Sequence, residues 1–135
     1  MNNPLGNIPV KGYATFDPLK TCLVGDVFPI KKFNHIKEDR ILSPLKKVIE
    51  ETKEDMENLS TQLQKLGVEV MRPDLSETPV DLSTYARKPP QQTRDDMAVV
   101  GENIYVANNL PEYRHILDRV AEDKKFYPKR YMDYT

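Results

Sequence analysis

The sequence predicts an α/β fold in which a mixed sheet is packed by one long helix. Three observations predict it: a short apolar segment ends at Gly25, an amphipathic pattern follows over residues 43–66, and two apolar segments flank a Gly-Glu-Asn turn. Strands that alternate with helices are typical of α/β proteins, because two parallel strands need a long crossover between them.

The 135 residues suit one domain with two flanking segments. Residues 1–15 are rich in proline and glycine and are predicted as an irregular N-terminal arm. Residues 16–121 are predicted as a single α/β domain. Residues 122–135 are predicted as an aromatic and basic C-terminal tail.

The first predicted strand is Leu19–Gly25, which follows a turn at residues 16–18. The clearest element is a helix over Ser43–Leu66. Ser43 is a favourable N-cap, Pro44 suits the first helical position, and Gly67 supplies a left-handed stop. Its apolar residues recur at steps of three and four, as on one helical stripe: Leu45, Ile49, Thr52, Met56, Leu59, Leu63 and Leu66. A coiled coil is the alternative, but only about three heptads are present.

After the helix, residues 68–71 are predicted as a strand and residues 74–92 as a long loop, of a length that tends to be functional or disordered. Residues 96–100 and 104–107 are predicted as a hairpin around the Gly-Glu-Asn turn. A second helix is predicted over Pro111–Ala121, with Asn109 as its cap.

Composition excludes several classes. A net charge of −1 and a pI near 6.1 argue against a nucleic-acid binder. The tail could stack bases, but docking of a terminus elsewhere is the commoner case; its candidates are Tyr127, Lys129, Arg130, Tyr131 and Tyr134. No apolar run reaches the roughly 18 residues of a membrane span, and no signal peptide is expected. The single cysteine fits a reducing, cytoplasmic location.

Common catalytic signatures are absent, and no cofactor or metal is expected. The chain has no glycine-rich phosphate loop and no G-x-S-x-G motif. His35 and His115 lack the spacing of a zinc site. Cys22 is a free thiol, for which a structural role is commoner than a catalytic one.

The candidate site is Arg94, Asp95 and Asp96, where a long loop delivers carboxylates to the start of a predicted core strand. A carboxylate there would suit a planar cation, because it accepts two parallel N–H bonds from a guanidinium. The alternative is that Asp95 or Asp96 pairs with Arg94 or caps a turn.

Three segments resemble the glycine amidinotransferase family. Residues 16–25 (F-D-P-L-K-T-C-L-V-G) resemble its opening W-D-P-L strand, and residues 67–73 (G-V-E-V-M-R-P) resemble its L-G-V-x-V-x-R-P segment. Residues 93–104 (T-R-D-D-M-A-V-V-G-E-N-I) resemble its P-R-D segment, with Thr93 in place of proline; arginine deiminases carry a similar T-R-D.

The resemblance implies a partial α/β propeller, with fewer than two of the five ββαβ units of these guanidine-modifying proteins, the penteins. It implies that Asp95 is the first guanidinium-binding carboxylate, beside Arg94, with Asp96 as the fallback. The resemblance implies that the family's catalytic Cys and His have no counterpart here: Cys22 stands where the family motif has an ordinary apolar residue, and His115 follows the hairpin rather than matching the family's His. Covalent turnover is therefore not expected from this chain alone.

The resemblance leaves two functions open. In the first, the chain is the N-terminal portion of an amidinotransferase-like enzyme, which moves an amidino group from an arginine-type donor to an amine. In the second, it is a non-catalytic interaction or structural subunit derived from that fold. The expected partners are a guanidino small molecule and another protein chain, or a second copy, that covers open strand edges.

Overall fold

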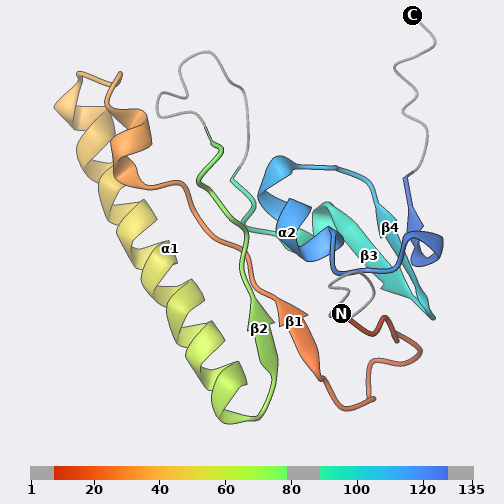
Figure 1. Ribbon diagram of the computed structural model, residues 1–135. Coiled ribbons are helices and arrows are strands. Elements are labelled where there is room, and N and C mark those ends of the chain that lie inside the picture. The colour runs from red at the N-terminus through yellow and green to blue at the C-terminus, as the bar shows by residue number, and fades with distance from the viewer. Residues whose placement is uncertain (1–7, 79–88, 128–135) are drawn as a thin grey trace, which may run out of the picture. The chain divides into compact units, whose positions relative to one another are not determined.

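The computed structural model describes residues 8–78 and 89–127, and its strands fall into two separate sheets (Figure 1). The chain divides into two compact units: residues 1–18 with 94–135 form unit 1, and residues 19–93 form unit 2. The sequence predicts one domain over residues 16–121, whereas the two sheets share no strand, so each unit has its own. The boundaries at residues 16 and 121 stay predictions.

Unit 2 is a strand–helix–strand unit. β1 (Thr21–Leu23) pairs in parallel with β2 (Glu69–Met71), and Cys22 lies opposite Val70. The helix α1 (Asp39–Lys65) connects them and packs against β2, and a 3₁₀ turn, η1 (Ile30–Phe33), precedes it. Both predicted strands and the connecting helix are confirmed, although the strands are three residues each. The buried apolar side chains here are Val24, Val27, Phe28, Val68 and Met71.

The predicted start of the helix is wrong. α1 begins at Asp39 with Glu38 as its N-cap, so Ser43 and Pro44 lie inside it. The first turn closes because the Glu38 carbonyl accepts the amides of Ile41 and Leu42, at 3.0 and 2.9 Å. A proline near a helix start forfeits one hydrogen bond to the residue four positions back, which the rest of a 27-residue helix outweighs.

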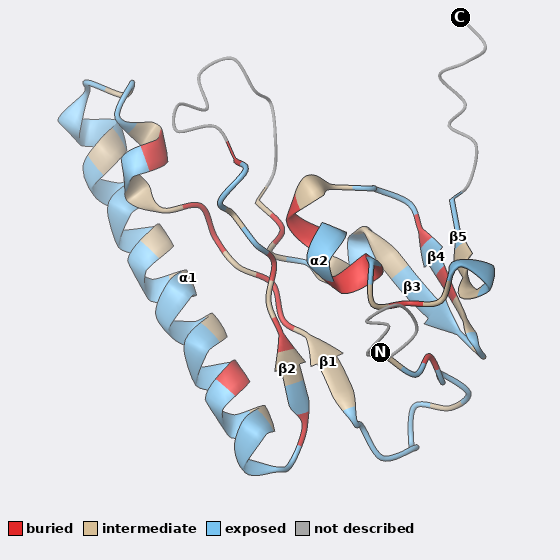
Figure 2. Cartoon of the chain, viewed as in Figure 1, coloured by how far each residue is buried: buried red, intermediate tan, exposed pale blue. Residues whose placement is uncertain are grey.

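The apolar stripe of α1 is displaced from the predicted one at its C-terminal end. Ser60 is the buried residue of the helix, while Leu59 and Leu66 are 49% and 79% exposed. Figure 2 shows that α1 is exposed over most of its length. Met56, Ser60 and Leu63 continue the three–four spacing, so Leu59 falls to the side of the packed stripe. Leu66 is the C-cap, one residue beyond the end of the helix at Lys65.

Gly67 ends α1 as predicted. Its φ of 81° lies in the left-handed region, its amide donates to the Gln64 carbonyl, and the Val68 amide donates to the Leu63 carbonyl. This pair of hydrogen bonds is the Schellman motif, in which glycine avoids the steric cost that a Cβ would meet.

Unit 1 holds the hairpin and a third strand. β3 (Met97–Val100) is antiparallel to β4 (Asn103–Val106), which is parallel to β5 (Lys125–Phe126). Gly101, at φ 62°, occupies the first loop position, as in a type II′ turn. The hairpin is confirmed. Gly12, from the predicted irregular arm, pairs with Gly101 through two backbone hydrogen bonds of 2.8 and 2.9 Å.

The second predicted helix is shorter than expected. Residues 111–113 form a 3₁₀ turn, η3, with Leu110 rather than Asn109 as its N-cap, and α2 covers only Arg114–Leu117. The amides of Arg119 and Val120 bond to carbonyls three residues back, so the helix tightens and stops. The buried apolar side chains of unit 1 are Val10, Ile104, Val106, Tyr113, Ile116, Leu117 and Val120.

The predicted tail is part of the sheet at its start. A 3₁₀ turn, η4 (Glu122–Lys124), leads into β5, where Phe126 stacks on Tyr105 with ring centroids 5.3 Å apart. Tyr127 is 47% exposed. The other four tail residues, at positions 129, 130, 131 and 134, lie outside the described residues. Across the described ranges, no helix combines the length and apolarity that a membrane span requires.

Candidate functional site

Asp95 lies in the 3₁₀ turn η2 (Thr93–Asp95), one residue before Asp96 and the start of β3. Its side chain is 66% exposed, and that of Arg94 is 85% exposed. The Arg94 Nε lies 3.7 Å from the Asp95 Oδ1, so the pairing that the sequence left open is formed. An ion pair this exposed contributes little to stability, at most about 1 kcal/mol.

Asp96 has a different environment, although it is the next residue. Its Oδ1 accepts a hydrogen bond from the Asn108 side-chain amide at 3.0 Å, and its Oδ2 accepts one from the Tyr113 hydroxyl at 2.7 Å. Its backbone carbonyl accepts the amides of Ala107 and Asn108, at 2.8 and 3.0 Å. Both carboxylate oxygens of Asp96 are therefore engaged within unit 1.

Tyr113 is the rigid partner in this arrangement. Its side chain is fully buried, as is the neighbouring Glu112. Burial, then the hydrogen bond to Asp96, and then the charges of Asp96 and Glu112 raise the pKa of Tyr113 far above its ordinary value. The phenol therefore stays protonated and keeps donating to Asp96 throughout the physiological range.

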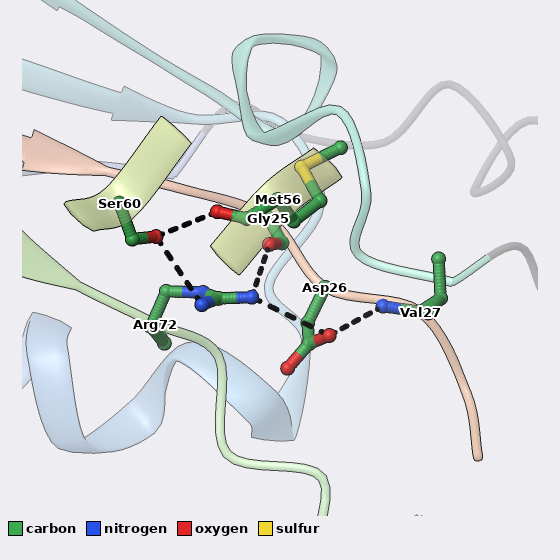
Figure 3. A network of polar contacts seen from close by, with 6 residues as sticks. All are labelled: Gly25, Asp26, Val27, Met56, Ser60 and Arg72. Carbon is green, nitrogen blue, oxygen red and sulfur yellow. Dashed lines mark hydrogen bonds and ion pairs between the residues drawn. The ribbon is translucent and has the colours of Figure 1, made fainter. Parts of the chain in front are cut away.

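A second polar cluster lies in unit 2, around Arg72 (Figure 3). One terminal nitrogen of Arg72 donates to the Ser60 hydroxyl at 3.2 Å; the other donates to the Gly25 carbonyl at 3.1 Å and lies 3.4 Å from Asp26 Oδ1. The Ser60 hydroxyl donates in turn to the Met56 carbonyl at 2.8 Å. The guanidinium thus joins the ends of β1 and β2 to the packed face of α1.

This cluster is a structural clamp that the sequence did not reveal. The R-P pair after β2 was visible as part of a family motif, but its partners lie 12 and 47 residues away and depend on the fold. Gly25 is required here, because a Cβ at this position would overlap the backbone of Pro90 and Gln91. Thr93 follows Pro90 and Gln91 in the chain, and its hydroxyl donates to the Leu23 carbonyl at 3.1 Å.

The surroundings of Cys22, His115 and His35 do not indicate a nucleophile or a general base. Cys22 lies within β1 and is half-buried, and burial raises the pKa of its thiol, which disfavours the reactive thiolate. His115 lies in α2, and the ring of His35 lies tilted against that of Phe33, with centroids 6.4 Å apart. Within the described ranges, no three residues of the types His, Cys, Asp and Glu are grouped to hold a metal ion.

Comparison with known proteins places the fold. No family model and no curated protein matches the sequence. Among solved structures, the chain is similar to inosamine-phosphate amidinotransferase from Streptomyces griseus, with a TM-score of 0.56 and 20% identity. The match covers 91% of this chain and 44% of that one, so the chain spans less than half of that enzyme.

The likeness establishes an amidinotransferase-like α/β fold with small open sheets. It does not select the glycine amidinotransferase family in particular, and the propeller arrangement stays a prediction.

Proposed function

We propose that the chain is the N-terminal portion of an amidinotransferase-like protein, in which Asp95 contributes the first carboxylate that binds the guanidinium of an arginine-type donor. The observation that carries the proposal is the amidinotransferase-like fold, matched over nearly the whole of this chain but less than half of the neighbour. The T-R-D motif gives Asp95 this role by resemblance.

The local geometry supports Asp95 over Asp96 as the ligand-binding residue. Both oxygens of Asp96 accept hydrogen bonds from within unit 1, whereas Asp95 exposes its carboxylate. The group that lies near Asp95 is the Arg94 guanidinium, which is the same chemical group that the proposed donor carries. Because an exposed ion pair is weak, a substrate guanidinium could displace Arg94 at small cost.

The reaction proposed for the complete protein transfers an amidino group from the donor to an amine. The nucleophile and the general acid/base would come from polypeptide beyond the matched region or from another chain, since neither Cys22 nor His115 fits these roles. This chain would then be inactive alone, and a partner chain or a second copy would cover its open strand edges.

The second candidate is a non-catalytic subunit derived from the same fold. The raised pKa of the Cys22 thiol favours it, because the described part of the chain then offers no activated nucleophile. Binding of a guanidino compound without turnover would fit either candidate, so binding at Asp95 is the property to test first.

The test is a titration of the ¹⁵N-labelled full chain with arginine, and with citrulline as the uncharged analogue of the same length. Arginine is expected to shift the amide resonances of residues 94–97 with a Kd on the order of 1 mM, and citrulline is not. Asp95→Asn should abolish the shifts. Asp123→Asn, the same change at another exposed aspartate of unit 1, should leave them intact.

Two results would contradict the proposal. The first is arginine binding that Asp95→Asn leaves unchanged. The second is amidino transfer by the chain alone that disappears in Cys22→Ala, because the nucleophile would then lie within this chain.

A further inference from the structure

Four hydrogen bonds converge on Asp96, the residue that follows the proposed ligand-binding carboxylate. Two are made by its backbone carbonyl, with the amides of Ala107 and Asn108. Two are made by its carboxylate, with the Asn108 side chain and the Tyr113 hydroxyl. All four donors come from the segment that leaves β4 and enters η3 (Pro111–Tyr113).

The backbone pair fixes where the chain enters β3. Met97 lies opposite Val106 in the ladder, so Asp96 and Ala107 are the next positions along the two strands. Two amides on one carbonyl hold this end of the hairpin closed, at the point where η2 turns into β3. The Cα of Asp95 is one residue from this anchor, and its position is restricted accordingly.

The two hydrogen bonds to the Asp96 carboxylate hold the same residue against a buried side chain, Tyr113. Tyr113 is fully buried, so its hydroxyl has little freedom to move. A hydroxyl donating to a carboxylate at 2.7 Å is a short, charge-assisted hydrogen bond. Asn108 is exposed and supplies the second, more adaptable donor.

We propose that Asp96, held by Tyr113 and Asn108, is a positioning residue that fixes Asp95 for guanidinium binding. This inference rests on the proposed function of Asp95. The Asp95 side chain is exposed, and its partner among the described residues is Arg94, in an exposed ion pair, so its orientation depends on the rigidity of the adjoining backbone. Fixing a binding group in advance reduces the ordering that the ligand must impose, which raises affinity without a new contact.

The test uses Tyr113→Phe, which removes the hydroxyl and keeps the buried ring. We expect the affinity of the full chain for arginine to fall roughly tenfold, which is the loss expected when one polar side chain must be ordered on binding. Tyr105→Phe is the matched control. It removes the same hydroxyl from an exposed tyrosine in β4, the strand that pairs with β3. Its affinity should equal that of the wild type.

Affinity is measured by amide shifts at a temperature where every variant is folded, and thermal unfolding is measured alongside. A purely structural role would lower the unfolding temperature and leave the affinity of the folded protein unchanged, and that result would overturn the inference. Asn108→Ala is the second variant, since an exposed position tolerates truncation. If Tyr113→Phe does not fold, an unchanged affinity in Asn108→Ala overturns the inference by itself.

The outcome separates the two proposals. If Asp95→Asn abolishes arginine binding while Tyr113→Phe and Asn108→Ala bind as the wild type does, the role of Asp95 stands and the positioning role of Asp96 falls. If Asp95→Asn has no effect, the proposed function falls and the inference falls with it.

Discussion

At the scale of single residues, two consecutive aspartates have different surroundings. Both carboxylate oxygens of Asp96 accept hydrogen bonds, from Asn108 and Tyr113, while Asp95 is exposed beside Arg94. Asp95 ends the 3₁₀ turn η2, whereas Asp96 is the residue just before β3 and accepts hydrogen bonds from the segment that follows β4.

Tyr113 gives a prediction about pH. Its pKa is raised in the folded protein, so the unfolded state loses its phenolic proton first, near the ordinary value of 10.0. The stabilising effect is complete below pH 10 and is lost as the pH rises towards the folded pKa. Between pH 10 and 11, we expect the free energy of unfolding of the wild type to fall by about 1 kcal/mol more than that of Tyr113→Phe.

Urea unfolding at a series of pH values measures both slopes. The other titrating groups are common to the two proteins, so their contributions cancel in the comparison. Equal slopes would mean that the Tyr113 hydroxyl is not protected from ionisation in the folded chain.

The sequence singled out residues 94–96 as the candidate site but did not predict how the surroundings of the two aspartates differ. A loop that delivers carboxylates to a strand was enough to single out residues 94–96. Which aspartate is engaged depends on Tyr113, 17 residues away, and therefore on how the hairpin and η3 pack. The Arg72 clamp escaped notice for the same reason, since Gly25 lies 47 residues from it.

At the scale of elements, local patterns predicted which segments are helices and strands better than where these begin. The spacing of apolar residues predicted the middle of α1, and Gly67 predicted its end. Gly101 predicted the turn of the hairpin. The start of α1 was misplaced because a Ser-Pro pair is a common helix start, yet Pro44 lies in the second turn here. The short α2 was overestimated because a run of apolar residues at helical spacing also fits successive 3₁₀ turns.

The helix start can be tested with two substitutions. If Ser43 were the N-cap, Ser43→Ala would cost about 1 kcal/mol. Because the structure puts Ser43 inside α1, we expect Ser43→Ala to stabilise the chain by about 0.5 kcal/mol, since alanine is the better helix former. Pro44→Ala should stabilise it by about 2 kcal/mol, because it restores an amide to the helix interior.

Chemical denaturation of the two variants and the wild type gives both free energies. A loss of stability in Ser43→Ala would restore Ser43 as the cap and shorten α1 at its N-terminus. The sign of the change, rather than its size, decides between the two helix starts.

At the scale of the whole molecule, each of the two units has its own sheet and its own set of buried apolar side chains. A defect confined to unit 2 should therefore lower hydrogen-exchange protection there and leave unit 1 protected. Gly25→Ala is the defect of choice, since its Cβ would overlap backbone atoms of Pro90 and Gln91. We expect the amides of Cys22 and Val70 to lose protection while those of Ile104 and Val106 keep theirs.

Gly67→Ala is the control for this experiment. It is the same change in the same unit, but its Cβ meets open space, so only the left-handed backbone is penalised, by about 1 kcal/mol. Its loss of protection should be smaller than that of Gly25→Ala. Equal loss in both units after Gly25→Ala would show that the chain unfolds as one cooperative body.

The three-residue strands of unit 2 also determine what holds them together. Cys22 and Val70 pair across 47 intervening positions, and closing a flexible segment of that length costs about 3–4 kcal/mol in chain entropy. A parallel ladder of three residues on each side cannot offset that cost by itself. The ladder therefore exists because α1 spans most of the gap as a stiff rod and carries Gly67 back to β1, which makes strand pairing in this unit a result of helix docking rather than its cause.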